Sequence, residues 1–225
     1  MGGRFSIWAH FGLGVAASLG LDGYTKLLEG AYKMDKHFLE EKLELNLPYI
    51  LGLTRIWNRN ILNLPSLAIV PYEIGLKYFP SWFQQVEMES NGKSVNSFNK
   101  KISNSPCSFI FGEVGTDAQH SFFQALHQST LSFTGDLICF SNNLNSEFCI
   151  FDDYDKNNSK DLQNFAISQY LAFKNGSDKT IKNVHQFVKG NKPVDLFMFN
   201  TLNEYTLGQL LCIYEYKTLF EASFV

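Results

Sequence analysis

Residues 109–128 read "FIFGEVGTDAQHSFFQALHQ", an apolar run of strand length that passes through a glycine-containing turn into a helical pattern. Thr116 stands three residues before Gln119, which is the spacing of a capping box that starts a helix. The pattern therefore predicts that Glu113 follows the carboxyl end of a strand, which in open α/β sheets is the edge where ligands bind. From spacing alone, a carboxylate that meets a ligand and a carboxylate that only caps a helix or makes an ion pair are comparable interpretations.

Apolar runs of the same kind recur along the chain, bounded by Pro, Gly, Asp or Asn, as is typical of parallel strands covered on both faces. With 108–113 they are "LAIVPY" (67–72), "DLICFS" (136–141) and "DLFMFN" (195–200). Amphipathic helical patterns occupy 24–45, 48–62, 73–86, 117–128, 160–174 and 203–216. Two polar, turn-rich stretches, 91–106 and 142–159, are expected to be exposed connections. The alternation predicts an α/β fold with a mainly parallel sheet and one layered domain over 1–225.

The amino-acid composition of the chain limits the kinds of molecule that the protein is expected to bind. The 225 residues are 45% hydrophobic and 15% aromatic, which is enough to bury a sizeable core. The net charge of -3, without a block of Lys or Arg, argues against a nucleic-acid partner. The four cysteines show no C-x-x-C pair, so we expect reduced thiols in a cytoplasmic protein and no zinc. The longest apolar run, 7–21, is too short to cross a membrane and is interpreted as a buried helix.

Five stretches of the chain resemble, in order and spacing, the central and later part of the phosphoglucose isomerase family. They are "GGRFSIWAHFGLG" (2–14), "WFQQVEMESNGK" (82–93), "GEVGTDAQHSFFQALHQ" (112–128), "FVKGNKP" (187–193) and "LGQLLCIYEYK" (207–217). The similarity covers almost the whole chain and is weakest over 142–175. It implies a three-layer, flavodoxin-like sandwich. Residues 1–225 would form a single sugar-isomerase domain, incomplete because the family's N-terminal half and C-terminal tail are absent.

The resemblance also implies an activity, the aldose-ketose isomerisation of glucose 6-phosphate and fructose 6-phosphate through a cis-enediolate. Matched residue by residue, Glu113 is the base that moves a proton between C1 and C2, and Arg4 stabilises the enediolate. The turn of Gly2 and Gly3 would hold Arg4 over the substrate. The expected substrate-binding residues are Gly3, Gly112, Gly115 and Thr116. Neither a metal nor another cofactor is expected, and the expected partners are a sugar phosphate and a second copy of the chain in a homodimer.

Departures from the family pattern put the activity of this chain alone in doubt. The family's phosphate-binding loop precedes its "GGR" motif, and its late Gln and Lys motif follows "LGQLLCIYEYK", so neither is found in 1–225. Asn157 and Asn158 stand where the family has paired histidines, and an asparagine cannot shuttle a proton at neutral pH.

Two alternative functions differ in class from the isomerase. A noncatalytic sugar-phosphate-binding module would need a phosphate loop of Ser and Thr, and none is present in the sequence. An inactive remnant would explain the substituted histidines and the altered "AHFG" that follows "GGRFSIW". His120 and His127 are expected to be helix-packing or hydrogen-bonding residues and not metal ligands, and "MESNGK" (88–93) is expected to be structural.

Overall fold

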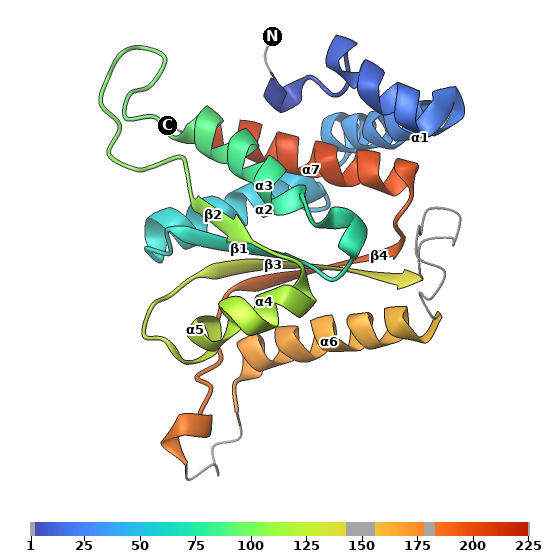
Figure 1. Cartoon of the computed structure of the whole chain (residues 1–225). Helices are drawn as coiled ribbons and strands as arrows, with labels where there is room; N and C mark the ends of the chain where they lie inside the picture. Colours follow the sequence, from blue (N-terminus) through green and yellow to red (C-terminus); the bar gives the residue numbers. More distant parts are fainter. Residues whose placement is uncertain (1–2, 143–155, 178–182, 225) are drawn as a thin grey trace. The chain divides into compact units, whose positions relative to one another are not determined.

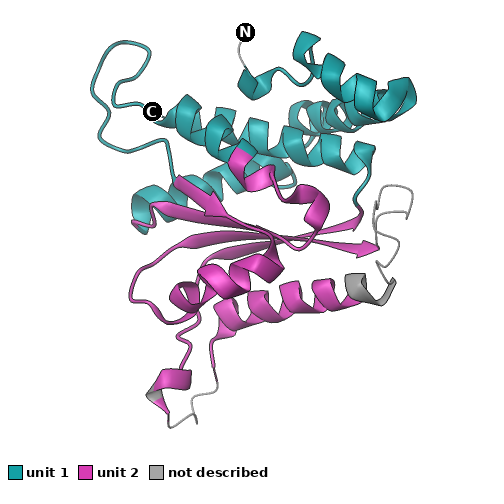
Figure 2. Ribbon diagram, in the orientation of Figure 1, with its two compact units in different colours: residues 1–62, 82–108, 202–225 teal, residues 63–81, 109–201 magenta. Residues whose placement is uncertain are grey.

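The computed structural model describes residues 3–142, 156–177 and 183–224 (Figure 1). The chain divides into two compact units, each assembled from separated segments (Figure 2). Unit 1 comprises Met1–Leu62, Trp82–Ser108 and Leu202–Val225, and unit 2 comprises Asn63–Ser81 and Phe109–Thr201. That these units together form one sugar-isomerase domain stays a prediction.

Unit 2 is built on a four-stranded parallel sheet. Its strands are β1 (Ser66–Pro71), β2 (Phe109–Gly112), β3 (Thr134–Asn142) and β4 (Val194–Thr201), in the spatial order β2-β1-β3-β4. All three strand pairs are parallel, and β1 and β3 are central and almost wholly buried. The predicted α/β class with a mainly parallel sheet is therefore confirmed. Each apolar run named above coincides with a strand to within one or two residues.

Helices pack against one face of this sheet. They are α4 (Gly115–Ser121), α5 (Phe123–Gln128) and α6 (Lys156–Asn175). Unit 2 also contains the 3-10 turns η4 (Ile74–Leu76) and η7 (Val184–Gln186). In Figure 1, α6 runs beside β3 and β4. The apolar core between helices and sheet holds Ala68, Val70, Tyr72, Ala118, Phe123, Leu126, Phe133, Leu137, Cys139, Ala166 and Phe173.

Two details of the helix predicted over 117–128 are wrong. Phe122, with φ of -121° and ψ of -4°, interrupts it and separates α4 from α5. The capping box at Thr116 is not formed, because α4 already begins at Gly115 and its N-cap residue, Val114, has no side-chain acceptor.

Unit 1 is helical. It contains α1 (Leu13–Glu40), α2 (Leu47–Ile56) and α7 (Glu204–Ala222), with the π-helical turns η3 (Trp57–Ile61) and η5 (Gln85–Glu89) and the 3-10 turns η1 (Gly3–Phe5) and η2 (His10–Gly12). The short helix α3 (Phe79–Gln84) precedes η5. Asn203 and Thr206 form a capping box that starts α7. Buried residues lie on nearly every side of α7, which contacts both α1 and α2, so α7 is the central helix of the unit.

The apolar run 7–21 is not the buried helix that its composition predicts. The chain forms the turn η2 first and enters α1 only at Leu13. Phe11, Leu13 and Leu21 are 68%, 71% and 78% exposed, and Gly20 breaks the helical geometry with φ of 71°. These exposed side chains form an apolar surface, whereas Trp8, in the same run, donates a hydrogen bond to Glu215 of α7. Among the helices of the described residues, none has the length and apolar character needed to cross a membrane.

Candidate active site

Glu113 lies where the sequence places it, directly after Gly112 at the carboxyl end of β2. Its side chain is exposed, and Oε2 accepts a hydrogen bond of 3.0 Å from the hydroxyl of Ser121, the last residue of α4. The carboxylate is thus held at the sheet edge by one neutral donor and remains open to solvent. A group of this kind can accept a proton from a molecule that reaches the edge of the sheet.

The glycines on either side of Glu113 have a packing role. A Cβ on Gly112 would lie 1.9 Å from the carbonyl oxygen of Ile69, its pairing partner in β1. A Cβ on Gly115 would lie 2.5 Å from the ring of Tyr72. Both contacts exclude any larger residue, so the backbone that carries Glu113 is fixed on both sides. Thr116 is exposed in the first turn of α4.

Arg4 lies in unit 1, in the turn η1. Its Nη1 donates a hydrogen bond of 3.1 Å to Oγ of Ser90, and its Nε lies 3.7 Å from Oε1 of Glu89. The Arg4 side chain is 34% exposed, so the guanidinium is anchored and still accessible. Both partners belong to the string "MESNGK", which therefore orients a candidate functional side chain as well as forming local structure.

Gly3 differs from the glycines around Glu113. A Cβ placed on Gly3 would have no neighbour within 4 Å, so the packing of the described residues does not require a glycine there. The hydroxyl of Ser6 donates a hydrogen bond of 3.0 Å to the carbonyl of Gly3 and closes the turn that contains Arg4. Gly2 lies outside the described residues.

Comparison with known proteins identifies the family to which the chain belongs. The sequence model described as phosphoglucose isomerase matches residues 1–224. The chain belongs to the phosphoglucose isomerase family. It is 37% identical to the glucose-6-phosphate isomerase of Acinetobacter baumannii over 231 residues, which cover 99% of the chain and 42% of that protein. A relative of the same name from Psychrobacter cryohalolentis is 36% identical, and the match covers 99% of this chain and 41% of that protein.

Solved structures agree with this family assignment. The crystal structure of a glucose-6-phosphate isomerase from Chlamydia trachomatis superposes with a TM-score of 0.88 at 37% identity, covering 98% of this chain and 42% of that one. A hypothetical protein from Thermus thermophilus, with a TM-score of 0.67 and 22% identity, shares the fold. The chain thus spans less than half the length of the phosphoglucose isomerases that it matches.

The structure groups the family's expected site residues by unit. Gly112, Glu113, Gly115 and Thr116 are adjacent in unit 2, whereas Gly3 and Arg4 belong to unit 1. Asn157 and Asn158, which stand where the family has paired histidines, lie at the start of α6. The structure describes their backbone but not their side chains.

His127 has structural surroundings. His127 Nε2 lies 2.7 Å from Oε1 of Gln169, and its ring stacks on Phe173 with centroids 4.5 Å apart. Burial lowers the pKa of His127, which favours the neutral ring. His120 is exposed on α4. Within the described residues, no group of three or more His, Cys, Asp or Glu side chains is arranged to hold a metal ion.

Proposed function

We propose that this chain supplies the proton-transfer part of a phosphoglucose isomerase site, which interconverts glucose 6-phosphate and fructose 6-phosphate. The observation that carries the proposal is Glu113, held at the carboxyl end of β2 by two glycines that packing requires, in the family's own motif. The homologous enzymes carry the name of this activity.

The proposed mechanism uses two side chains. In the open-chain aldose, the Glu113 carboxylate takes the proton from C2, and the electrons of the C–H bond form the C1–C2 double bond of a cis-enediolate. As that double bond forms, the electrons of the C1 carbonyl move onto O1. The hydroxyl proton of O2 then passes to O1, and the C2–O2 electrons form the ketose carbonyl as protonated Glu113 returns the carbon-bound proton to C1. Arg4 stabilises the negative oxygen of the enediolate, because a guanidinium stays protonated at any working pH. The hydroxyl of Ser121 orients the carboxylate.

Substrate contacts are proposed at Gly3, Gly112, Gly115 and Thr116. A Cβ on Gly112 would point at the carbonyl oxygen of Ile69 in β1. A sugar at this position would therefore contact the backbone of Gly112. The proposal assigns proton transfer and enediolate stabilisation to this chain. Phosphate binding and ring opening are assigned to family motifs that do not occur among these 225 residues.

A chimaera tests the proposal. Residues 1–225 would replace the matching segment of the Acinetobacter baumannii enzyme, so that all other family motifs are supplied. We expect isomerase turnover in a coupled assay that follows fructose 6-phosphate. Replacing Glu113→Gln in this chimaera should lower kcat by about 10²–10⁴-fold, because a positioned acid-base group contributes that much.

The matched control is Glu29→Gln, which changes an exposed carboxylate on α1 and should leave kcat unchanged. Equal turnover in the Glu113→Gln chimaera and its parent, both folded by circular dichroism, would exclude Glu113 as the base.

We further propose that the protein acts in the cytoplasm, in glycolysis and gluconeogenesis, and that it associates as a homodimer. Support for association comes from the exposed apolar side chains of η2 and α1, among them Phe11, Leu13, Leu21 and Leu39. Light scattering should give a mass that rises to twice 25.7 kDa with concentration. A constant monomer mass at high concentration would contradict this expectation.

A further inference from the structure

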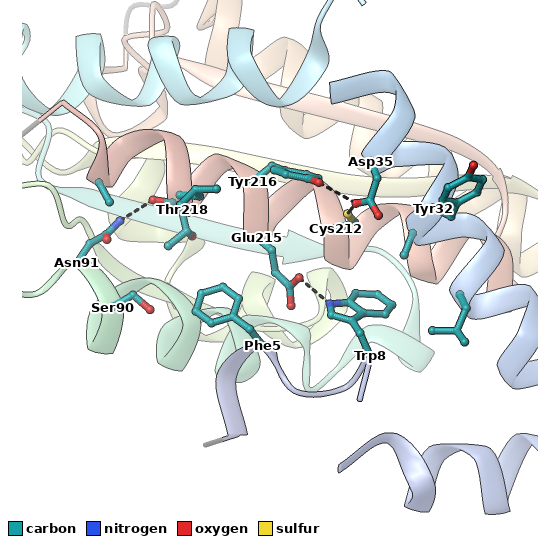
Figure 3. A pocket seen from close by; sticks show the side chains of 14 residues that line it. Phe5, Trp8, Tyr32, Asp35, Ser90, Asn91, Cys212, Glu215, Tyr216 and Thr218 are labelled. Carbon is teal, nitrogen blue, oxygen red and sulfur yellow. Dashed lines mark hydrogen bonds between the residues drawn. The ribbon is translucent and has the colours of Figure 1, made fainter. Parts of the chain in front are cut away.

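Unit 1 contains a cavity with a volume of about 650 Å³ that the proposed isomerase chemistry does not use (Figure 3). It is open on one side and is lined by η1 and the segment that follows it, by α1, by the residues that follow η5 and by α7. Sites for small molecules have volumes of roughly 300–1,000 Å³ and mostly apolar walls. The walls here include the aromatic side chains Phe5, Trp8, Tyr32 and Tyr216.

Glu215 places an incompletely paired carboxylate in this cavity. Its Oε2 accepts a hydrogen bond of 2.7 Å from the indole Nε1 of Trp8, as Figure 3 shows. Its Oε1 is buried and has no hydrogen-bond partner. A buried acceptor without a donor is costly, more so when it is charged, so a ligand that brings a donor would relieve this cost.

Asp35 adds a second carboxylate from α1. Its Oδ1 accepts a hydrogen bond of 2.8 Å from the hydroxyl of Tyr216 and another of 3.3 Å from the thiol of Cys212. Asp35 and Glu215 are the charged side chains among the residues that line the cavity, and both are acidic. The cavity therefore combines aromatic faces with negative charge, which together favour an organic cation.

We propose that this cavity binds a small organic cation, a primary ammonium group on an aromatic or alkyl body. The ammonium would donate hydrogen bonds to Oε1 of Glu215 and lie near Asp35, and the body would pack against Phe5, Trp8 and Tyr32. An ammonium has three donors and no acceptor, which suits a site that offers carboxylate oxygens.

The titration of Glu215 gives this site a distinctive pH response. Burial raises the pKa of Glu215, the hydrogen bond from Trp8 lowers it and the nearby Asp35 carboxylate raises it, so that the pKa lies at about 7. Cys212 and Tyr216 on α7 also face Asp35, and burial keeps both groups neutral. An alkylammonium stays protonated up to a pH of about 10, like lysine. Affinity should therefore rise between about pH 6 and 8, as the carboxylate loses its proton.

Calorimetric titration of the 225-residue chain with tryptamine tests the proposal, with indole-3-propionate as the anionic analogue of similar shape. Tryptamine should bind with one-to-one stoichiometry, and the anion should not bind. Glu215→Gln keeps the acceptor for Trp8 but removes the charge. It should weaken tryptamine binding by about tenfold or more and abolish the rise between pH 6 and 8. The exposed control Glu29→Gln should change neither result.

A second variant, Asp35→Asn, retains an acceptor for Tyr216 and should also weaken tryptamine binding, which covers the case in which Glu215→Gln does not fold. Thermal unfolding establishes that each titrated variant is folded. Failure of tryptamine to bind, equal binding of indole-3-propionate, or unchanged affinity in both folded variants would overturn the proposal. Binding of a lysine-containing peptide without binding of tryptamine would also overturn it, in favour of a polypeptide site.

Discussion

A polypeptide of residues 1–225 is expected to isomerise glucose 6-phosphate at least about 10²–10⁴-fold more slowly than the complete Acinetobacter baumannii enzyme, since a single acid-base group is worth that much. Glu113 and Arg4 are present, but the family's phosphate loop, ring-opening histidine and late lysine have no counterpart among these residues. Binding energy from the phosphate orients the reacting carbons in such enzymes, so its loss lowers kcat as well as affinity. The exposure of Glu113 acts in the same direction, because solvent surrounds the base.

The measurement is a coupled assay on the purified chain, beside its Glu113→Gln variant. The separate losses need not multiply, because groups that act as a unit are not additive. Turnover close to that of the complete enzyme, lost in the variant, would contradict the expected loss of rate while supporting Glu113 as the base. Similar turnover in both proteins would contradict the role of Glu113.

Raising the pH is expected to destabilise unit 1 through Glu87, by an amount on the order of 3–5 kcal/mol between pH 4.5 and 8. Glu87 is 1% exposed, and its Oε2 accepts hydrogen bonds of 3.0 Å from Thr218 and 3.4 Å from Asn91. Its Oε1 has no partner, whereas the neighbouring buried Glu221 is paired with Arg59. Burial, followed by the charge of Glu221, raises the pKa of Glu87 to about 8.

The sign follows from proton binding. Because the folded pKa lies above that of an unfolded Glu, the folded state holds more protons between about pH 4.5 and 8. The stability that unit 1 gains from a protonated Glu87 is fully present below this range, and it is lost as the pH rises through about 8. Glu87→Gln mimics the protonated side chain, so it should match the parent near pH 4.5 and exceed its stability above pH 8.

Urea unfolding of both proteins from pH 4.5 to 9 provides the comparison. Glu29→Gln, a change at an exposed site, should leave the pH dependence as it is in the parent. Parallel stability curves for the parent and Glu87→Gln would show that Glu87 does not carry a proton in the folded state.

The sheet and the position of Glu113 could be predicted from local patterns, because buried parallel strands read as continuous apolar runs that end at polar or turn residues. The start of the helix at Gly115 could not be predicted in this way, because the capping-box spacing indicated Thr116 as the N-cap whereas the N-cap is Val114, two residues earlier. The run 7–21 failed for a different reason. Apolar composition predicts burial only when another element covers the side chains, and local sequence does not reveal that element.

Long-range partners were also beyond local patterns. Arg4 and Ser90 are 86 residues apart, and no periodicity links them. Ser121 lies eight residues after Glu113, across a turn and a short helix whose geometry sets the distance. The sequence drew attention to Glu215 only as part of the family motif over 207–217. Its hydrogen bond with Trp8 joins residues 207 positions apart, which no local pattern reveals.

The segmented construction of the two units has a consequence for synthesis on the ribosome. All four strands of unit 2 have been translated by Thr201, so its sheet can form while the chain is still growing. Unit 1 cannot be completed at that stage, because its central helix, α7, spans Glu204–Ala222 and is made afterwards. Until α7 emerges, the faces of α1 and α2 that it covers remain open, and this interval is when the nascent chain is most exposed to aggregation and to chaperones.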